Sequence, residues 1–119
     1  MSAEILKNKE TILECSSVTF DIMYLNFLEI VEKNPLLGNN TEIKKFMNYM
    51  EMYNYQGGSY WFDITNYITS SESAELLINI LEQTIVKIQH SISKNAIMSL
   101  WSFYEELVKY RDELKARGQ

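Results

Sequence analysis

The chain has 119 residues, the usual length of one domain and enough to bury a hydrophobic core. Its apolar fraction of 46% is typical of a folded protein rather than a disordered one. The net charge of −5 argues against nucleic-acid binding, because nucleic-acid binders present a basic surface. The sequence contains no run of about eighteen apolar residues, and its charged start does not resemble a signal peptide. We therefore expect a cytoplasmic protein without a membrane segment.

The first expected element is a helix over residues 3–14, which contributes Ile5, Leu6, Ile12 and Leu13 to the core. A second helix is expected from about Val18 to Lys33. Its apolar residues occur nearly all round, which indicates a central position. Whether residues 15–17 separate these two helices stays open at this point.

A third helix is expected from about residue 41 to Tyr55, followed by the helix-ending pair Gly57-Gly58. Asn39 and Glu42 have the spacing of a capping box at its start, with Thr41 as the alternative cap.

Residues 59–70 fit either a short strand or an irregular turn of helix, because they combine aromatic and β-branched side chains. Thr69 and Glu72 then form a capping box in front of a long apolar run with helical phase. One helix from Glu72 almost to Gly118 would be about 70 Å long, too long for a compact domain of this size. We expect a break within residues 90–95, where Ser and Asn weaken the helix propensity.

The expected fold is therefore all-α, a single domain over residues 1–119 built as a bundle of four to five helices.

Few residues offer catalytic or metal-binding chemistry. His90 is the only histidine and falls on a polar helix face, and Cys15 is the only cysteine, expected to be a small, at least half-buried hydrophobe. A transition-metal site needs more nitrogen and sulfur ligands than these. No serine lies in a nucleophile-elbow pattern, and Gly57-Gly58 lacks the rest of a phosphate-binding loop. We expect no catalytic residue, no metal and no other cofactor. A small enzyme is the weakest of the functions considered.

Aromatic residues gather in the segment "YMEMYNYQGGSYWFDITNY", which begins at Tyr49 and holds five of the eight tyrosines. Helical phase directs Tyr49, Met52 and Tyr55 away from the expected core face. With Tyr60 and Trp61 they predict an exposed patch of the kind enriched at protein interfaces. The alternative is that Trp61, Phe62 and Tyr67 plug the end of the bundle, and for Phe62 we expect this packing role.

The next helix carries an acidic strip, Glu72, Glu75, Asn79 and Glu82, at spacings of three and four residues. No Lys or Arg occurs between Phe46 and Val86, so we expect no basic residue to compensate it. Such a surface attracts cationic partners, although a simply solvated face is equally compatible with the pattern. The predicted partner-binding residues are Tyr49, Met52, Tyr55, Tyr60, Trp61, Asp63, Glu72, Glu75, Asn79 and Glu82.

The segment "YWFDITNYITSSESAELLINILEQTI" and the acidic strip together resemble helical immunity proteins of bacterial polymorphic toxin systems, of the contact-dependent inhibition or colicin type. The resemblance covers about a quarter of the chain and includes no diagnostic motif. It implies a non-enzymatic acidic protein that neutralises a cognate basic toxin, a nuclease, by occluding its active-site groove. The alternative is a homodimeric helical adaptor or regulator that uses the aromatic patch as a self-interface.

Overall fold

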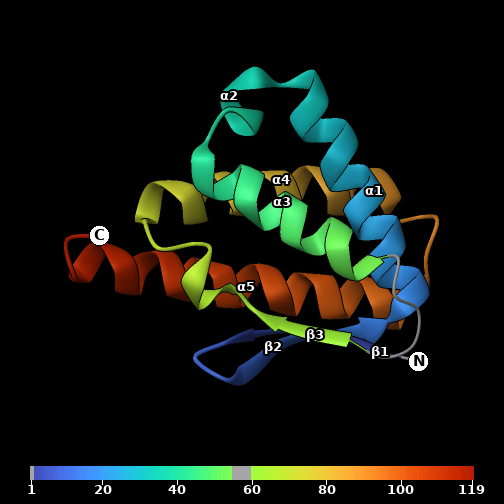
Figure 1. Ribbon diagram of the computed structural model, residues 1–119. Coiled ribbons are helices and arrows are strands. Elements are labelled where there is room, and N and C mark those ends of the chain that lie inside the picture. The colour runs from blue at the N-terminus through green and yellow to red at the C-terminus, as the bar shows by residue number, and fades with distance from the viewer. Residues whose placement is uncertain (1, 55–59) are drawn as a thin grey trace.

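The computed structural model describes residues 2–54 and 60–119, and Figure 1 shows their arrangement. The elements are β1 Ser2–Lys7, β2 Glu10–Ser16, α1 Ser17–Lys33, α2 Pro35–Gly38, α3 Thr41–Asn54, β3 Tyr60–Asp63, the 3₁₀ turn η1 Ile64–Asn66, α4 Ser71–Ile88 and α5 Lys94–Ala116. The described chain is mostly helical, as predicted. It also contains a small three-stranded sheet, so the prediction of a purely all-α fold is wrong.

The N-terminal segment forms the hairpin β1–β2, where the sequence analysis predicted a helix over residues 3–14. Asn8 and Lys9 form its two-residue turn with φ angles of 51° and 69°, the backbone that matches the twist of a tight hairpin. Ala3 and Ile5 are fully buried and Glu4 between them is not, which is the two-residue period of a strand. The helix was predicted because Ile5 and Ile12, and Leu6 and Leu13, have the seven-residue spacing of a helix face.

Side chains from β3 and η1 hold the hairpin turn. The Asn8 N–H donates to Thr65 Oγ1 at 2.8 Å, and the Lys9 N–H donates to Asp63 Oδ2 at 2.8 Å. Burial raises the pKa of the Asp63 carboxyl, but the hydrogen bonds from Thr65, Lys9 and Asn8 outweigh it and the pKa is lowered. Asp63, predicted to contact a partner, therefore has a structural role.

The ambiguous residues 59–70 contain the short strand β3 followed by η1. Strand β3 runs parallel to β1 in a sheet of order β2-β1-β3, with Phe62 opposite Ile5. The Phe62 ring is fully buried and meets Phe20 of α1 and Phe46 of α3 edge-on, with centroids 6.0 and 5.7 Å away. The sheet is thereby anchored to two helices.

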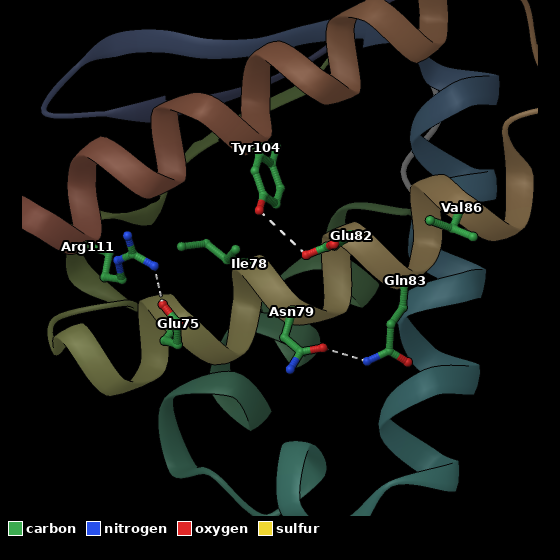
Figure 2. A pocket seen from close by; sticks show the side chains of 8 residues that line it. All are labelled: Glu75, Ile78, Asn79, Glu82, Gln83, Val86, Tyr104 and Arg111. Carbon is green, nitrogen blue, oxygen red and sulfur yellow. Dashed lines mark hydrogen bonds and ion pairs between the residues drawn. The ribbon is translucent and has the colours of Figure 1, made fainter.

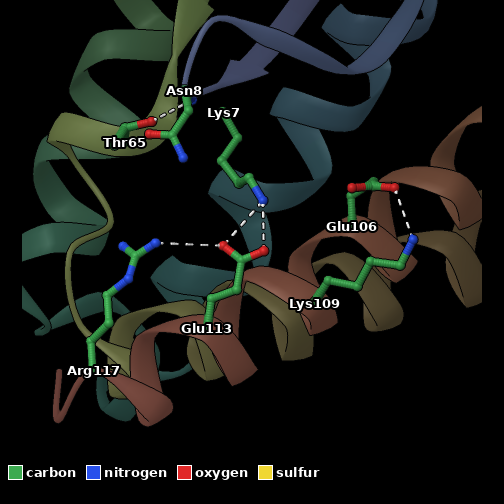
Figure 3. Close-up of polar contacts among 7 residues, drawn as sticks. All are labelled: Lys7, Asn8, Thr65, Glu106, Lys109, Glu113 and Arg117. Atoms are coloured by element: carbon green, nitrogen blue, oxygen red, sulfur yellow. Dashed lines mark hydrogen bonds and ion pairs between the residues drawn. The ribbon is translucent and has the colours of Figure 1, made fainter.

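In Figure 1, α5 lies between the sheet and α4, and α1 and α3 pack against α4 on the side that faces the viewer. Lys7 of β1 reaches α5, where its Nζ lies 3.1 Å from Glu113 Oε1 and 5.6 Å from the centre of the Tyr110 ring. Figure 3 shows that Arg117 approaches the same carboxylate and that Lys109 pairs with Glu106. Lys109 of α5 and Arg117, just after its end, are thus paired with neighbouring acids.

The predicted helix from Val18 to Lys33 is confirmed as α1, and the predicted break at residues 90–95 separates α4 from α5. Helix α1 is not buried all round, because Val18 and Leu25 are exposed on one side. The predicted end of the third helix at Gly57-Gly58 lies outside the described residues.

The predicted helix caps are wrong by one residue in each case. Asn40 caps α3, its Oδ1 accepting from the Ile43 N–H at 3.0 Å, and neither Asn39 nor Thr41 does so. Ser70 caps α4, its Oγ accepting from the Ser73 N–H at 3.1 Å, in place of Thr69. Both caps use the side-chain types that the sequence offered at neighbouring positions.

Glu42 therefore takes no part in a capping box, and its carboxylate instead binds the residues just before α4. Its carboxylate accepts from the N–H groups of Thr69, at 3.0 Å, and Ser70, at 3.2 Å, and from both hydroxyls. Partial burial raises the pKa of Glu42, but hydrogen bonds from Thr69, Ser73 and Ser70 prevail and lower it. This carboxylate fixes where α4 begins relative to α3.

Replacing Glu42 with Gln should lower the free energy of unfolding by about 1–2 kcal/mol, because an amide nitrogen would face N–H and O–H donors. The folded-state pKa lies below the unfolded one, so this contribution is present above the unfolded pKa and is lost as pH falls through the folded pKa. Urea unfolding of E42Q and wild type at neutral and acidic pH measures both effects.

The matched control is Glu51→Gln, on the same helix and exposed. Equal stability of E42Q and E51Q at neutral pH, or an E42Q deficit that persists unchanged in acid, would contradict the assigned role of Glu42.

Candidate partner-binding groove

Helices α4 and α5 run antiparallel and leave a groove between their exposed edges. Two contacts cross it: Arg111 Nη1 donates to Glu75 Oε2 at 2.5 Å, and the Tyr104 hydroxyl lies 3.5 Å from Glu82 Oε2. Figure 2 shows these contacts along one open channel of about 550 Å³. Its lining residues are Glu75, Ile78, Asn79, Glu82, Gln83, Val86, Tyr104 and Arg111.

Three residues of the acidic strip, Glu75, Asn79 and Glu82, line the α4 wall of this groove. Glu72, Glu75, Asn79 and Glu82 are all exposed, whereas Leu77 and Leu81 on the opposite side of α4 are fully buried. The Asn79 Oδ1 accepts a hydrogen bond from Gln83 Nε2 at 2.7 Å, which holds the Asn79 side chain between the Glu75 and Glu82 carboxylates. The helical spacing therefore predicted correctly which side of α4 faces solvent.

One basic residue does compensate the strip, contrary to the prediction. The hydrogen bond to Glu75, and after it the smaller effect of the hydrogen bond to Asp112, hold the pKa of Arg111 above its usual value. Arg111 lies 36 positions beyond Glu75, so a count of charges along α4 could not reveal it. Lys87, which is on α4, pairs instead with Glu29 of α1, with 2.7 Å between Lys87 Nζ and Glu29 Oε2. The lining still carries two carboxylates, Glu75 and Glu82, against the one guanidinium of Arg111, so the groove stays negative overall.

Tyr104 lines the α5 wall and Trp101 packs beside it, and the sequence analysis assigned neither residue to a site. The Trp101 and Tyr104 rings meet edge-on with centroids 5.3 Å apart. Trp101 is 39% exposed and Val86 of α4 is 59% exposed. The signal was present in the sequence, because Trp101, Tyr104 and Arg111 are three and seven residues apart and so share one helix face.

The predicted aromatic patch on α3 is only partly exposed. Tyr49 is half-buried: its ring centre lies 5.0 Å from that of Phe62 and 4.4 Å from that of Tyr67. The prediction that Tyr49 points away from the core is therefore wrong, because β3 and η1 supply a second layer that covers it. Met52 is 57% exposed, beside a smaller pocket of about 270 Å³.

Trp61 lies on another surface, the outer face of the sheet. It is 61% exposed and sits opposite Glu4 in the strand register. The Tyr60 backbone pairs with Ala3, and Tyr55 lies outside the described residues.

The predicted binding residues thus do not form one surface. Figure 1 shows α3 in front of α4, whereas Figure 2 looks onto the acidic strip with the other helices behind α4. The pocket beside Met52 shares no lining residue with the groove that holds the strip. The structure joins the strip to Tyr104 of α5, whose ring packs against Trp101, instead of to the aromatic side chains of α3.

The groove offers carboxylates, carboxamides, a guanidinium and a phenol hydroxyl as hydrogen-bonding groups. Within residues 2–54 and 60–119, no group of three or more His, Cys, Asp or Glu side chains could hold a metal ion. Burial, with lesser contributions from Asp21 and Glu14, raises the pKa of the half-buried Cys15 thiol to about 12, so it stays protonated and weakly nucleophilic. None of the described helices is both long and apolar enough to cross a membrane.

Comparison with known proteins gives no relative: no family model, curated protein or solved structure matches the chain. The groove must therefore be interpreted from its own geometry and charge.

Replacing Tyr49 with Ala should destabilise the protein by about 2–4 kcal/mol, because it removes a ring packed against Phe62 and Tyr67. Met52→Ala on the same helix removes an exposed side chain and should change the stability by less than about 0.5 kcal/mol. Thermal melts of the two variants test this. Similar melting temperatures would show that Tyr49 is not part of the core.

Proposed function

We propose that this chain is a non-enzymatic acidic binding protein that neutralises a basic protein toxin, and that the groove between α4 and α5 receives the toxin. The observation that carries this proposal is the combination of exposed carboxylates, Glu75 and Glu82, on one wall with the half-buried Tyr104 on the other, next to the exposed Trp101. The resemblance to immunity proteins supplies the biological setting, with a nuclease as the cognate toxin and the cytoplasm as the compartment.

The two walls would act on different steps of binding. Glu72, Glu75 and Glu82 attract a cationic surface over a distance and so raise the association rate. Trp101 and Tyr104 offer apolar area with polar edges, which is the composition of energetic centres at interfaces. Once water is excluded around them, dissociation slows.

A nuclease suits this surface because its substrate groove is built to hold phosphates. Carboxylates on an exposed helix can take the place of those phosphates in charge-assisted hydrogen bonds with Arg and Lys. Seated there, the chain would exclude the nucleic acid from the active site. Inhibition by occlusion needs no chemistry from the inhibitor, in keeping with a groove that offers only binding groups.

The kinetic prediction is that Glu75→Lys with Glu82→Lys slows association with the partner by about tenfold or more and reduces its sensitivity to salt. The partner is recovered by pull-down with the wild-type chain, and rates are measured by surface plasmon resonance at several salt concentrations.

The matched control is Glu14→Lys with Glu51→Lys, which makes the same change in net charge at exposed positions of β2 and α3. The control should stay within about threefold of wild type, since distant charges are screened. Equal slowing by both pairs would mean that net charge alone steers the partner and that the groove has no special part. A partner that lacks toxic activity when expressed alone would overturn the toxin assignment.

The alternative function, a homodimeric adaptor or regulator, is favoured by one observation. Trp61 is the most exposed aromatic side chain with described burial, and it lies on the sheet face away from the groove. The predicted self-interface is reduced by the burial of Tyr49, so it would have to be built around Trp61. Sedimentation equilibrium distinguishes the two: a dimer that dissociates on Trp61→Ala favours the adaptor, and a monomer at all concentrations favours the binding protein.

A further inference from the structure

The two carboxylates that line the groove have a spacing that constrains the partner. Glu75 and Glu82 are seven residues apart on α4, which is two helical turns or about 10.5 Å along the axis. Both are exposed on the same side of the helix. A partner that engages both must present two cationic groups about that far apart and facing the same way.

An extended segment does not meet this requirement. At about 3.3 Å per residue, a strand covers 10.5 Å in three residues, and residues three apart point to opposite faces. A helix does meet it, because residues seven apart lie on one face, two turns from each other. The geometry of the α4 wall therefore favours a helical partner lying along the groove.

The apolar residues of the groove follow the same period. Ile78, nearly buried, lies between the two carboxylates, and Val86 lies one turn beyond Glu82. From the contact Glu75–Arg111 to the contact Glu82–Tyr104, the residue number rises by seven on α4 and falls by seven on α5. Continuing this register brings Val86 level with the turn of α5 that holds Trp101. Apolar side chains of a partner helix, placed between and beyond its cations, would meet these residues.

The two carboxylates differ in how far they are already engaged. Glu75 binds the Arg111 guanidinium through Oε2, which shows that this position accepts a charge-assisted bond. Among the described residues, Glu82 has a long contact of 3.5 Å with the Tyr104 hydroxyl and no ion pair. A partner cation at Glu82 therefore gains more than one at Glu75, where it must share the carboxylate with Arg111.

We propose that the α4–α5 groove docks a cationic amphipathic helix of the partner, with Arg or Lys at positions i and i+7 and apolar side chains at i+3 or i+4 and at i+11. This inference rests on the proposed function, because it names the element by which a basic partner occupies the groove. A helix lying between two helices would complete a three-helix packing arrangement.

The test uses tryptophan fluorescence as a local reporter. The chain has two tryptophans, so Trp61→Phe leaves Trp101 as the only indole, beside the groove. Two stapled, equally helical peptides of the same composition are titrated, one with arginines seven positions apart and one with arginines five apart, on different faces. The phased peptide should shift the Trp101 emission to shorter wavelength and bind about tenfold tighter than the misphased one.

Variants in the Trp61→Phe background locate the binding. Glu82→Lys should abolish the preference for the phased peptide, whereas Glu14→Lys, the matched change on β2, should retain it. Equal affinity for the two peptides, or binding that is unaffected by Glu82→Lys, would overturn the helix proposal. The toxin assignment is judged separately, by the partner recovered in the pull-down. If association with that partner depends on Glu75 and Glu82 but the chain binds the two peptides equally, the proposed function stands and the helix proposal is refuted.

Discussion

The Phe62 ring is the contact on which the arrangement of the molecule depends. It comes from a four-residue strand, yet Phe20 of α1 and Phe46 and Tyr49 of α3 all meet it within 6.0 Å of its centre. Because successive strand side chains point to opposite faces, burying Phe62 forces Trp61 outward. The same contact turns Tyr49 inward and so divides the aromatic residues between the core and two separate surfaces.

Much of the helical architecture could be predicted from the sequence, because long helices repeat their apolar period many times. The segments that became α1, α3, α4 and α5 each gave that signal, and Ser and Asn residues marked the break before Lys94. The hairpin was mistaken for a helix because Ile5 and Ile12, and likewise Leu6 and Leu13, are seven residues apart, which is the spacing of one helix face. Asn8, which tolerates a positive φ, was the local signal for the turn.

The groove was predictable on one wall only. A stripe of Glu72, Glu75, Asn79 and Glu82 can be read from spacing, but the neighbour across from it depends on how two helices pack. Arg111 and Tyr104 reach the strip from 36 and 22 positions further along the chain. Periodicity shows which side of a helix faces out, and tertiary packing decides which two outward sides face one another.

The hairpin turn has a consequence for the order in which the molecule can assemble. Its two backbone N–H groups are satisfied by Thr65 and Asp63, 57 and 54 positions later in the chain, and β1 is the central strand between β2 and β3. An isolated hairpin of two short strands is marginal in water. During synthesis the first sixteen residues therefore cannot settle into their final pairing until more than half of the chain has emerged, and loop closure over this distance slows folding. The hairpin is made before the residues that complete its hydrogen bonds, so it is among the last parts to become stable.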